Sequence, residues 1–134
     1  MVWANMGLID SLLSLVPVIT QLVAISSGAA FNGSGGWGAY SISKSALNLL
    51  IRVYGNEHPK THFSSLAPGV VDTAMVQKVL AMHAHRRYSA KGRIHRASEE
   101  GGILSPAEAA DRIVARLPRL RERPSGSYAD IRQM

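Results

Sequence analysis

A tyrosine and a lysine, Tyr40 and Lys44, stand four residues apart near the start of an expected helix. At that spacing two side chains share one helical face, with about 5–6 Å between their Cβ atoms. A phenol has a pKa of about 10 and is a poor base at neutral pH, but a neighbouring ammonium stabilises the phenolate and lowers that pKa. The pair could therefore exchange a proton with an alcohol or carbonyl oxygen, which is general acid–base chemistry.

Two further features accompany this pair. Ser27 ends an expected strand that should abut the helix, so its hydroxyl could hold the same substrate oxygen as Tyr40. The segment "PGVVDT", residues 68–73, follows the next expected strand. A Tyr-x-x-x-Lys spacing alone often arises by chance, and its ordinary interpretation is an amphipathic surface pair. The combination favours an active site.

The elements that must position these residues can be read from periodicity and caps. Helical spacing predicts helices over 7–20, 40–56, 74–85 and 105–117, the last capped by Ser105 with Glu108 three residues later. Branched apolar runs predict strands over 21–26, 61–69 and 125–131, and small residues over 27–36 predict a loop. Alternating strands and helices indicate an α/β fold with a parallel sheet. Ligands of such sheets bind beyond the carboxyl ends of the strands, where Ser27 and residues 68–73 fall.

Composition limits the class of protein. The 134 residues suffice for one domain, and 46% hydrophobic with 18% charged residues is typical of a globular chain. The absence of cysteine excludes disulfides, thiolate metal sites and cysteine nucleophiles. Asp10 and Pro17 interrupt the apolar region from Leu8 to Ile25, so we expect neither a membrane span nor a targeting segment, and a cytoplasmic location.

Much of the net charge of +6 falls in one basic run, His83 to Arg96. Such a run could contact phosphate on a nucleic acid or a ligand. No nucleic-acid-binding motif is present, and charge runs are usually solvated, so we interpret the segment as a solvated, partly mobile loop. His83 and His85 have poor spacing for metal ligands on a helix, and we expect no metal site.

Three motifs together resemble the short-chain dehydrogenase/reductase family: "VAISSGAA" (residues 23–30), "YSISK" (40–44) and "PGVVDT" (68–73). The resemblance extends from about residue 5 to the C-terminus. Within the family, "GW" (residues 36–37) before the tyrosine and "AKG" (90–92) are most similar to the sepiapterin reductase and benzil reductase group. The resemblance implies an NAD(P)-dependent oxidoreductase that reduces a small carbonyl compound or oxidises an alcohol, with NADP favoured over NAD.

The resemblance also implies a role for each catalytic residue. Tyr40 would donate a proton to the carbonyl oxygen, or remove one in the reverse direction. Lys44 would lower the pKa of that phenol and hydrogen-bond the nicotinamide ribose. Ser27 would orient the substrate oxygen, while Ser26 would be structural. For Asn5 two interpretations stay open: a member of a proton relay, or a fraying N-terminal residue.

The cofactor residues follow from the third motif. Pro68, Gly69 and Val71 would line the nicotinamide, and Thr73 would hydrogen-bond its carboxamide or a phosphate. The family's Gly-rich pyrophosphate turn has no counterpart in this chain. We therefore expect the C-terminal half of a Rossmann-type doubly wound parallel sheet, with about three strands and flanking helices, forming a single partial domain over residues 1–134.

A half sheet has consequences for partners. The serine strand would present an open apolar edge. The helices over 7–20 and 40–56 correspond to the family's usual subunit-contact helices, so we expect a homo-oligomer, a dimer. The alternative is a truncated, non-catalytic remnant that acts as an interaction module. A nucleic-acid binder built on residues 83–96 is the least favoured interpretation.

Overall fold

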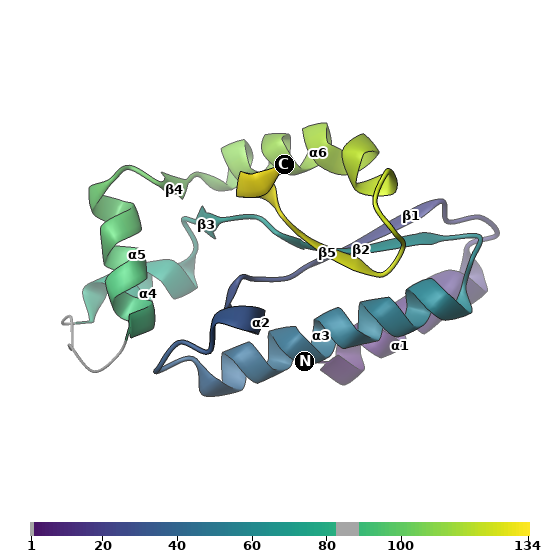
Figure 1. Ribbon diagram of the computed structural model, residues 1–134, viewed down its shortest axis with the longest axis horizontal. Helices are drawn as coiled ribbons and strands as arrows, with labels where there is room; N and C mark the ends of the chain where they lie inside the picture. The colour runs from purple at the N-terminus through teal and green to yellow at the C-terminus, as the bar shows by residue number, and fades with distance from the viewer. Residues whose placement is uncertain (1, 83–88) are drawn as a thin grey trace.

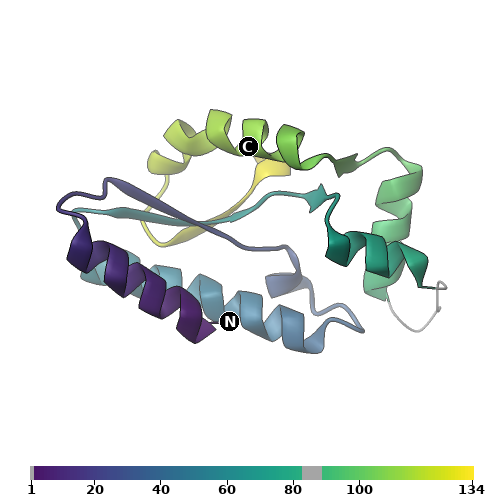
Figure 2. The same ribbon diagram turned by 180° about the vertical axis from the view of Figure 1, so that it is seen from behind.

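The computed structural model describes residues 2–82 and 89–134 and has three layers: helices, sheet and helix. The central sheet is parallel with strand order β1–β2–β5, and Val23 pairs with Ser64 while Ser65 pairs with Tyr128. Helices α1 and α3 cover one face and α6 covers the other (Figures 1 and 2). The α/β fold class predicted from the sequence is confirmed. The bounds are α1 Val2–Leu15, β1 Gln21–Ile25, α3 Gly38–Glu57, β2 His62–Ala67, α6 Pro106–Arg121 and β5 Ser127–Asp130.

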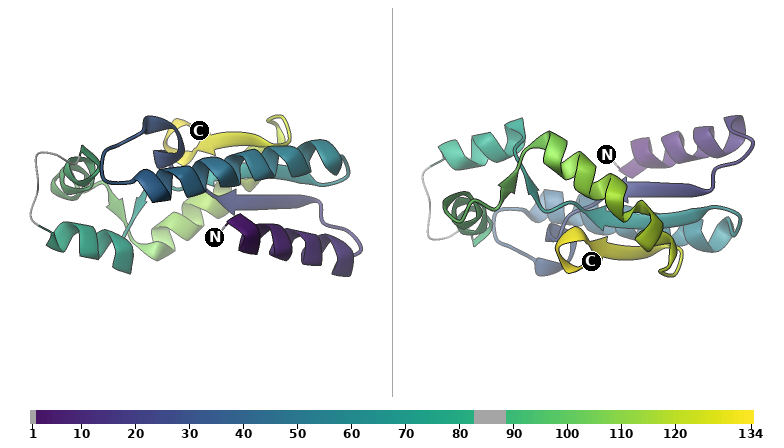
Figure 3. Two further views of the ribbon diagram at one scale, coloured as in Figure 1. Left: turned by 90° about the horizontal axis from the view of Figure 1, so that it is seen from below. Right: turned by 90° about the horizontal axis from the view of Figure 1, so that it is seen from above.

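A second, smaller unit lies beyond the carboxyl end of β2 (Figures 1 and 3). Its two strands, β3 (Val70–Val71) and β4 (Ile103–Leu104), pair in parallel with each other. Between them along the chain come α4 (Ala74–Ala81) and α5 (Ser89–Glu99). A four-residue helix, α2 (Ala29–Asn32), follows β1, and a 3₁₀ turn, η1 (Ile131–Gln133), follows β5. These short elements surround the end of the sheet that carries the predicted site.

The core consists of one apolar cluster on each face of the sheet. The cluster under α1 and α3 contains Ile9, Leu47, Ile51, Tyr54 and Phe63. The cluster under α6 contains Leu66, Leu120, Ala129 and Ile131. Successive residues of β2 point to opposite faces of the sheet, so this strand contributes to both clusters. This is why the central strand is apolar or small along its whole length.

Helix α3 lies directly against the start of β5 because two glycines meet there. A Cβ at Gly55 would lie 2.7 Å from the backbone nitrogen of Gly126, and one at Gly126 would lie 2.9 Å from Arg52 Cα. Gly126 also has a φ of +80°, a left-handed conformation that favours glycine. This contact sets the height of α3 above the sheet and so helps to position Tyr40 and Lys44 in its first turns.

Several sequence-based boundaries need correction. The first helix begins earlier than predicted, at Val2, and ends before Pro17, as proline requires. The expected loop over 27–36 contains α2. The basic run was predicted to be a loop, and that prediction is wrong for residues 89–96, which belong to α5. Residues 83–88, with His83 and His85 and the end of the helix predicted over 74–85, lie outside the described residues.

Two kinds of structural feature are absent from the described part of the chain. None of its helices is long and apolar enough to cross a membrane. Within residues 2–82 and 89–134, no group of three or more His, Asp or Glu side chains is arranged to hold a metal ion.

Candidate active site

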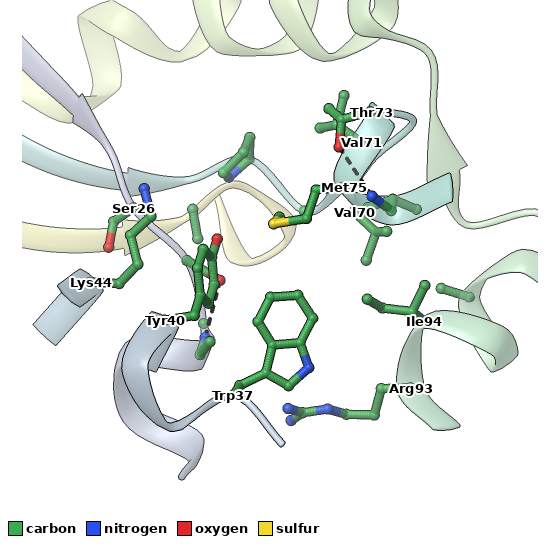
Figure 4. A pocket seen from close by; sticks show the side chains of 18 of the residues that line it. Ser26, Trp37, Tyr40, Lys44, Val70, Val71, Thr73, Met75, Arg93 and Ile94 are labelled. Atoms are coloured by element: carbon green, nitrogen blue, oxygen red, sulfur yellow. Dashed lines mark hydrogen bonds between the residues drawn. The ribbon is translucent and has the colours of Figure 1, made fainter. Parts of the chain in front are cut away.

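A cavity of about 470 Å³ lies beyond the carboxyl ends of β1 and β2 (Figure 4). It is bounded by the loop after β1, the first turns of α3, the turn after β2, and the inward faces of α4 and α5. Its volume is in the range of small-molecule sites, roughly 300–1,000 Å³. Seven of the site residues predicted from the sequence line it: Ser27, Tyr40, Lys44, Pro68, Gly69, Val71 and Thr73.

Tyr40 and Lys44 lie on the same face of α3, as their spacing predicts. The Lys44 Nζ lies 5.9 Å from the centroid of the Tyr40 ring. The same Nζ donates a hydrogen bond of 2.7 Å to the carbonyl oxygen of Ile25, the last residue of β1. Burial lowers the pKa of the Lys44 ammonium below its ordinary value. The lysine is thus held between the end of a strand and the phenol, with its remaining hydrogens available to a ligand.

Trp37 forms the wall next to the phenol. It immediately precedes α3, and its ring meets the Tyr40 ring edge-on, with centroids 4.7 Å apart and an interplanar angle of 64°. Trp37 lines the cavity. Met75 of α4 also lines the cavity and is 44% exposed.

The two serines after β1 have different surroundings. Ser26 is buried, and its hydroxyl donates to Asn48 Oδ1 of α3 at 2.6 Å while its backbone nitrogen donates to the Leu66 oxygen at 2.7 Å. These bonds tie strand, helix and strand together, in agreement with the structural role expected of Ser26. Ser27 is half-buried at the cavity, and its Oγ accepts from the Ala29 nitrogen at 3.2 Å. Its hydroxyl hydrogen is therefore free to be donated.

The turn after β2 is built by a glycine and two short strands. Gly69 has a φ of +85°, which turns the chain sharply after Pro68. Val70 and Val71 then pair with β4, and the Asp72 nitrogen donates to the Leu104 oxygen at 2.8 Å. The chain next enters α4.

Thr73 caps that helix. Its hydroxyl oxygen accepts from the Val76 nitrogen at 3.4 Å, as an N-cap does. The hydroxyl hydrogen of Thr73 can still be donated to a ligand in the cavity.

Asn5 is the predicted site residue that lies elsewhere. It is half-buried on α1 and is not among the residues that line the cavity. Helix α1 lies beside α3 in the helical layer (Figure 3). The structure therefore does not bring Asn5 together with the other seven. Its part in a proton relay stays a prediction.

Sequence reasoning missed the cationic side chains at this cavity. Arg93 and Arg96 reach it from α5, and Arg132 reaches it from η1. Arg132 donates to Asp130, and this hydrogen bond holds the pKa of the Asp130 carboxyl below its usual value. The signal in the sequence was the basic run itself, in which Arg93 and Arg96 have helical spacing.

Comparisons with known proteins agree with this geometry. A family model described as short chain dehydrogenase matches residues 18–84. Benzil reductase ((S)-benzoin forming) from Bacillus subtilis is 32% identical over 116 residues, which cover 84% of this chain and 46% of the relative. Sepiapterin reductase from Rattus norvegicus is 31% identical over 110 residues, covering 82% of this chain and 41% of the relative. The chain thus spans less than half the length of these two curated relatives.

Solved structures share the fold. The KRED1-Pglu enzyme superimposes with a TM-score of 0.70 at 29% identity, over 81% of this chain and 46% of that one. An angucycline C-6 ketoreductase with bound NADP gives a TM-score of 0.66 at 23% identity, over 94% of this chain and 47% of that one.

Proposed function

The chain belongs to the short-chain dehydrogenase family, and from that premise we propose that it is an NAD(P)-dependent oxidoreductase with Tyr40 as general acid and base. It reduces the carbonyl group of a small molecule to an alcohol, or runs the reaction in reverse. The observation that carries this proposal is the meeting of Ser27, Tyr40 and Lys44 at one cavity beyond the carboxyl ends of β1 and β2.

Each of these residues has a physical task in the reduction. The Ser27 hydroxyl, whose oxygen is already engaged by the Ala29 nitrogen, donates to the carbonyl oxygen and orients it. The Tyr40 phenol donates its proton to the same oxygen as negative charge develops there. The Lys44 ammonium, fixed by the Ile25 carbonyl, stabilises the phenolate that remains. In the alcohol-oxidising direction the phenolate takes the proton back.

The residues present fit the nicotinamide end of a dinucleotide. When bound, the cofactor supplies or accepts the hydride. Lys44 has ammonium hydrogens beyond the one that Ile25 accepts, which suits the ribose hydroxyls. Val71 offers its backbone and Thr73 its hydroxyl hydrogen to the carboxamide or to a phosphate, next to a turn that Gly69 leaves without a side chain. The cofactor is NADP or NAD, and we favour NADP, the form bound in the angucycline ketoreductase of the same fold.

Replacement of one phenolic oxygen tests the proposal. Tyr40→Phe is expected to lower the rate of NADPH-dependent reduction of benzil by at least about 100-fold, because the proton donor is lost. Tyr54→Phe is the matched control: it removes the same atom from the same helix, but from a phenol that binds Asp10 away from the cavity. Oxidation of NADPH followed by absorbance measures both. Unchanged turnover in Tyr40→Phe would refute the role of Tyr40.

One observation favours a second function. Large apolar side chains on α1 and α3 are exposed, among them Trp3 at 77% and Ile42 at 71%. A non-catalytic remnant of the family could use such faces as an interaction module. Folded wild-type chain that binds no dinucleotide by calorimetry and turns over no carbonyl, yet forms a stable complex with another chain, would favour this alternative.

A further inference from the structure

An arginine with no carboxylate partner stands at the mouth of the candidate cavity. Arg93 lies on α5, and its Nη2 donates to Asn32 Oδ1 at 3.1 Å and to Ser34 Oγ, both neutral acceptors. No ion pair engages Arg93 among residues 2–82 and 89–134, where the pair found joins Arg132 to Asp130. Arg93 lines the cavity, and its positive charge is not neutralised by an ion pair within these residues.

The two neutral acceptors also fix the orientation of this guanidinium. Asn32 ends α2 and Ser34 follows it, so the bonds connect α5 with the segment between β1 and α3. The Nε and Nη1 hydrogens of Arg93 have no acceptor in the described part of the chain and remain available. An arginine with pre-oriented, free N–H groups is suited to a planar anion such as a carboxylate.

Between Arg93 and the phenol lies an apolar wall. In Figure 4 the indole of Trp37 stands between the Tyr40 ring and the Arg93 side chain, with Met75 and Ile94 near it. A ligand whose carbonyl meets Tyr40 would therefore lie along the indole and reach Arg93 with its other end. Flat, apolar ligand bodies pack well against an aromatic ring of this kind.

The position of Arg93 favours a substrate group over a cofactor phosphate as the anion. Thr73 and Val71, the residues proposed to meet the cofactor, lie on the far side of Trp37 from Arg93 (Figure 4). Arg96 follows Arg93 by three positions, so it lines the cavity from the same face of α5 and adds positive charge. Among the described residues of the lining, Glu100 is the single acidic one, and it lies one turn beyond Arg96.

We propose that the cavity takes a carbonyl compound with a flat apolar body and a carboxylate at the end remote from the carbonyl, and that Arg93 holds this carboxylate. This proposal rests on the proposed function only for the carbonyl end of the ligand, which meets Tyr40. Arg93 is then the residue that selects acidic substrates over neutral ones of the same shape.

A matched ligand pair tests it: 4-formylbenzoate and its methyl ester, which differ in the remote charge. Binding to the wild-type chain is followed by calorimetry, without turnover. The acid is expected to bind about tenfold more tightly than the ester, and the difference should shrink as salt is added. Arg93→Gln should abolish the preference, and Arg93→Lys should retain part of it. Lys60→Gln removes the same charge from the exposed turn before β2, at the opposite end of the sheet, and should change nothing.

The outcomes separate this proposal from the proposed function. Equal affinity of acid and ester, no binding of the acid, or equal weakening of both ligands by Arg93→Gln would overturn it. Weaker binding of NADP with unchanged binding of the acid in Arg93→Gln would assign the arginine to a cofactor phosphate and overturn it too. A preference for the acid that depends on Arg93 supports it even if Tyr40→Phe leaves turnover intact, a result that would count against the proposed function alone. Arg93→Lys, which keeps the charge, reports on the site should Arg93→Gln fail to fold.

Discussion

Asp130 fixes the Arg132 side chain at the end of β5, and this contact makes stability depend on pH. Its Oδ1 accepts from the Arg132 Nε at 2.9 Å and from the Arg132 backbone nitrogen at 3.0 Å. The side-chain hydrogen bond in particular lowers the pKa of the Asp130 carboxyl, although burial opposes it. A carboxyl whose pKa is lower in the folded state contributes stability above its unfolded pKa of about 4, and loses it as the pH falls through the folded pKa.

Asp130→Asn is therefore expected to lower the free energy of unfolding by about 1 kcal/mol at pH 7, a modest value because Arg132 is largely in solvent. The difference from wild type should shrink as the pH falls from 7 to 3, because acid progressively protonates the Asp130 carboxyl. Urea unfolding at the two pH values measures it. Asp111→Asn, an exposed carboxylate on α6, is the control and should have little effect. A difference that does not shrink with acid would show that lost packing, not lost charge, is responsible.

Single residues also mark how far sequence reasoning extends into the site. Tyr40 and Lys44 were predictable as neighbours, because a helix of known period fixes their relation, and the end of a parallel strand predicts where Ser27 falls. Arg93 and Arg132 were not predictable, because their places depend on how α5 and η1 fold back over the sheet. Asn5 was assigned by family resemblance alone, and the structure does not bring it to the cavity.

At the scale of elements, α6 begins with a capping box that should contribute measurably to stability. Ser105 Oγ accepts from the Glu108 nitrogen at 3.2 Å, and the Ser105 nitrogen donates to Glu108 Oε2 at 2.9 Å. Ser105→Ala is expected to cost about 1 kcal/mol in the free energy of unfolding, because the first turn loses its acceptor. Chemical denaturation measures it, with Ser98→Ala on the exposed last turn of α5 as the control. Equal effects of the two substitutions would contradict the role of the cap.

The same local signals explain which elements were predictable. The caps of α6 and the apolar period of α3 are formed by residues close together in the sequence. The positions of these two helices therefore follow from the sequence. Strands β3 and β4 have two residues each, too few to show a period, and they form only because two distant segments meet. Helix α5 was not predicted because its residues are mostly basic, small or polar, a composition typical of loops.

At the scale of the whole molecule, two apolar surfaces lack partners within the described residues. Strand β1 is at the edge of the sheet, and Ile25 at its end is 45% exposed. Helices α1 and α3 lie side by side on one face and expose Trp3, Leu15 and Leu49 at 77%, 80% and 61% (Figure 3). We propose that residues 1–134 form one partial domain and that this domain is oligomeric, because exposed apolar faces of this kind mark interaction sites.

The outer face of α3 is expected to join two copies of the chain, so a charge placed there should separate them. Leu49→Glu is expected to convert a dimer into a monomer in sedimentation experiments, because the carboxylate would be buried unpaired in the interface. Val114→Glu is the matched control, since Val114 is 63% exposed on α6, in the opposite layer, and its replacement should leave the dimer intact. A dimer that survives Leu49→Glu but not Val114→Glu would move the contact to the α6 layer. If the wild-type chain is monomeric at concentrations where dimers of the family persist, the exposed faces of α1 and α3 would instead bind a different protein chain.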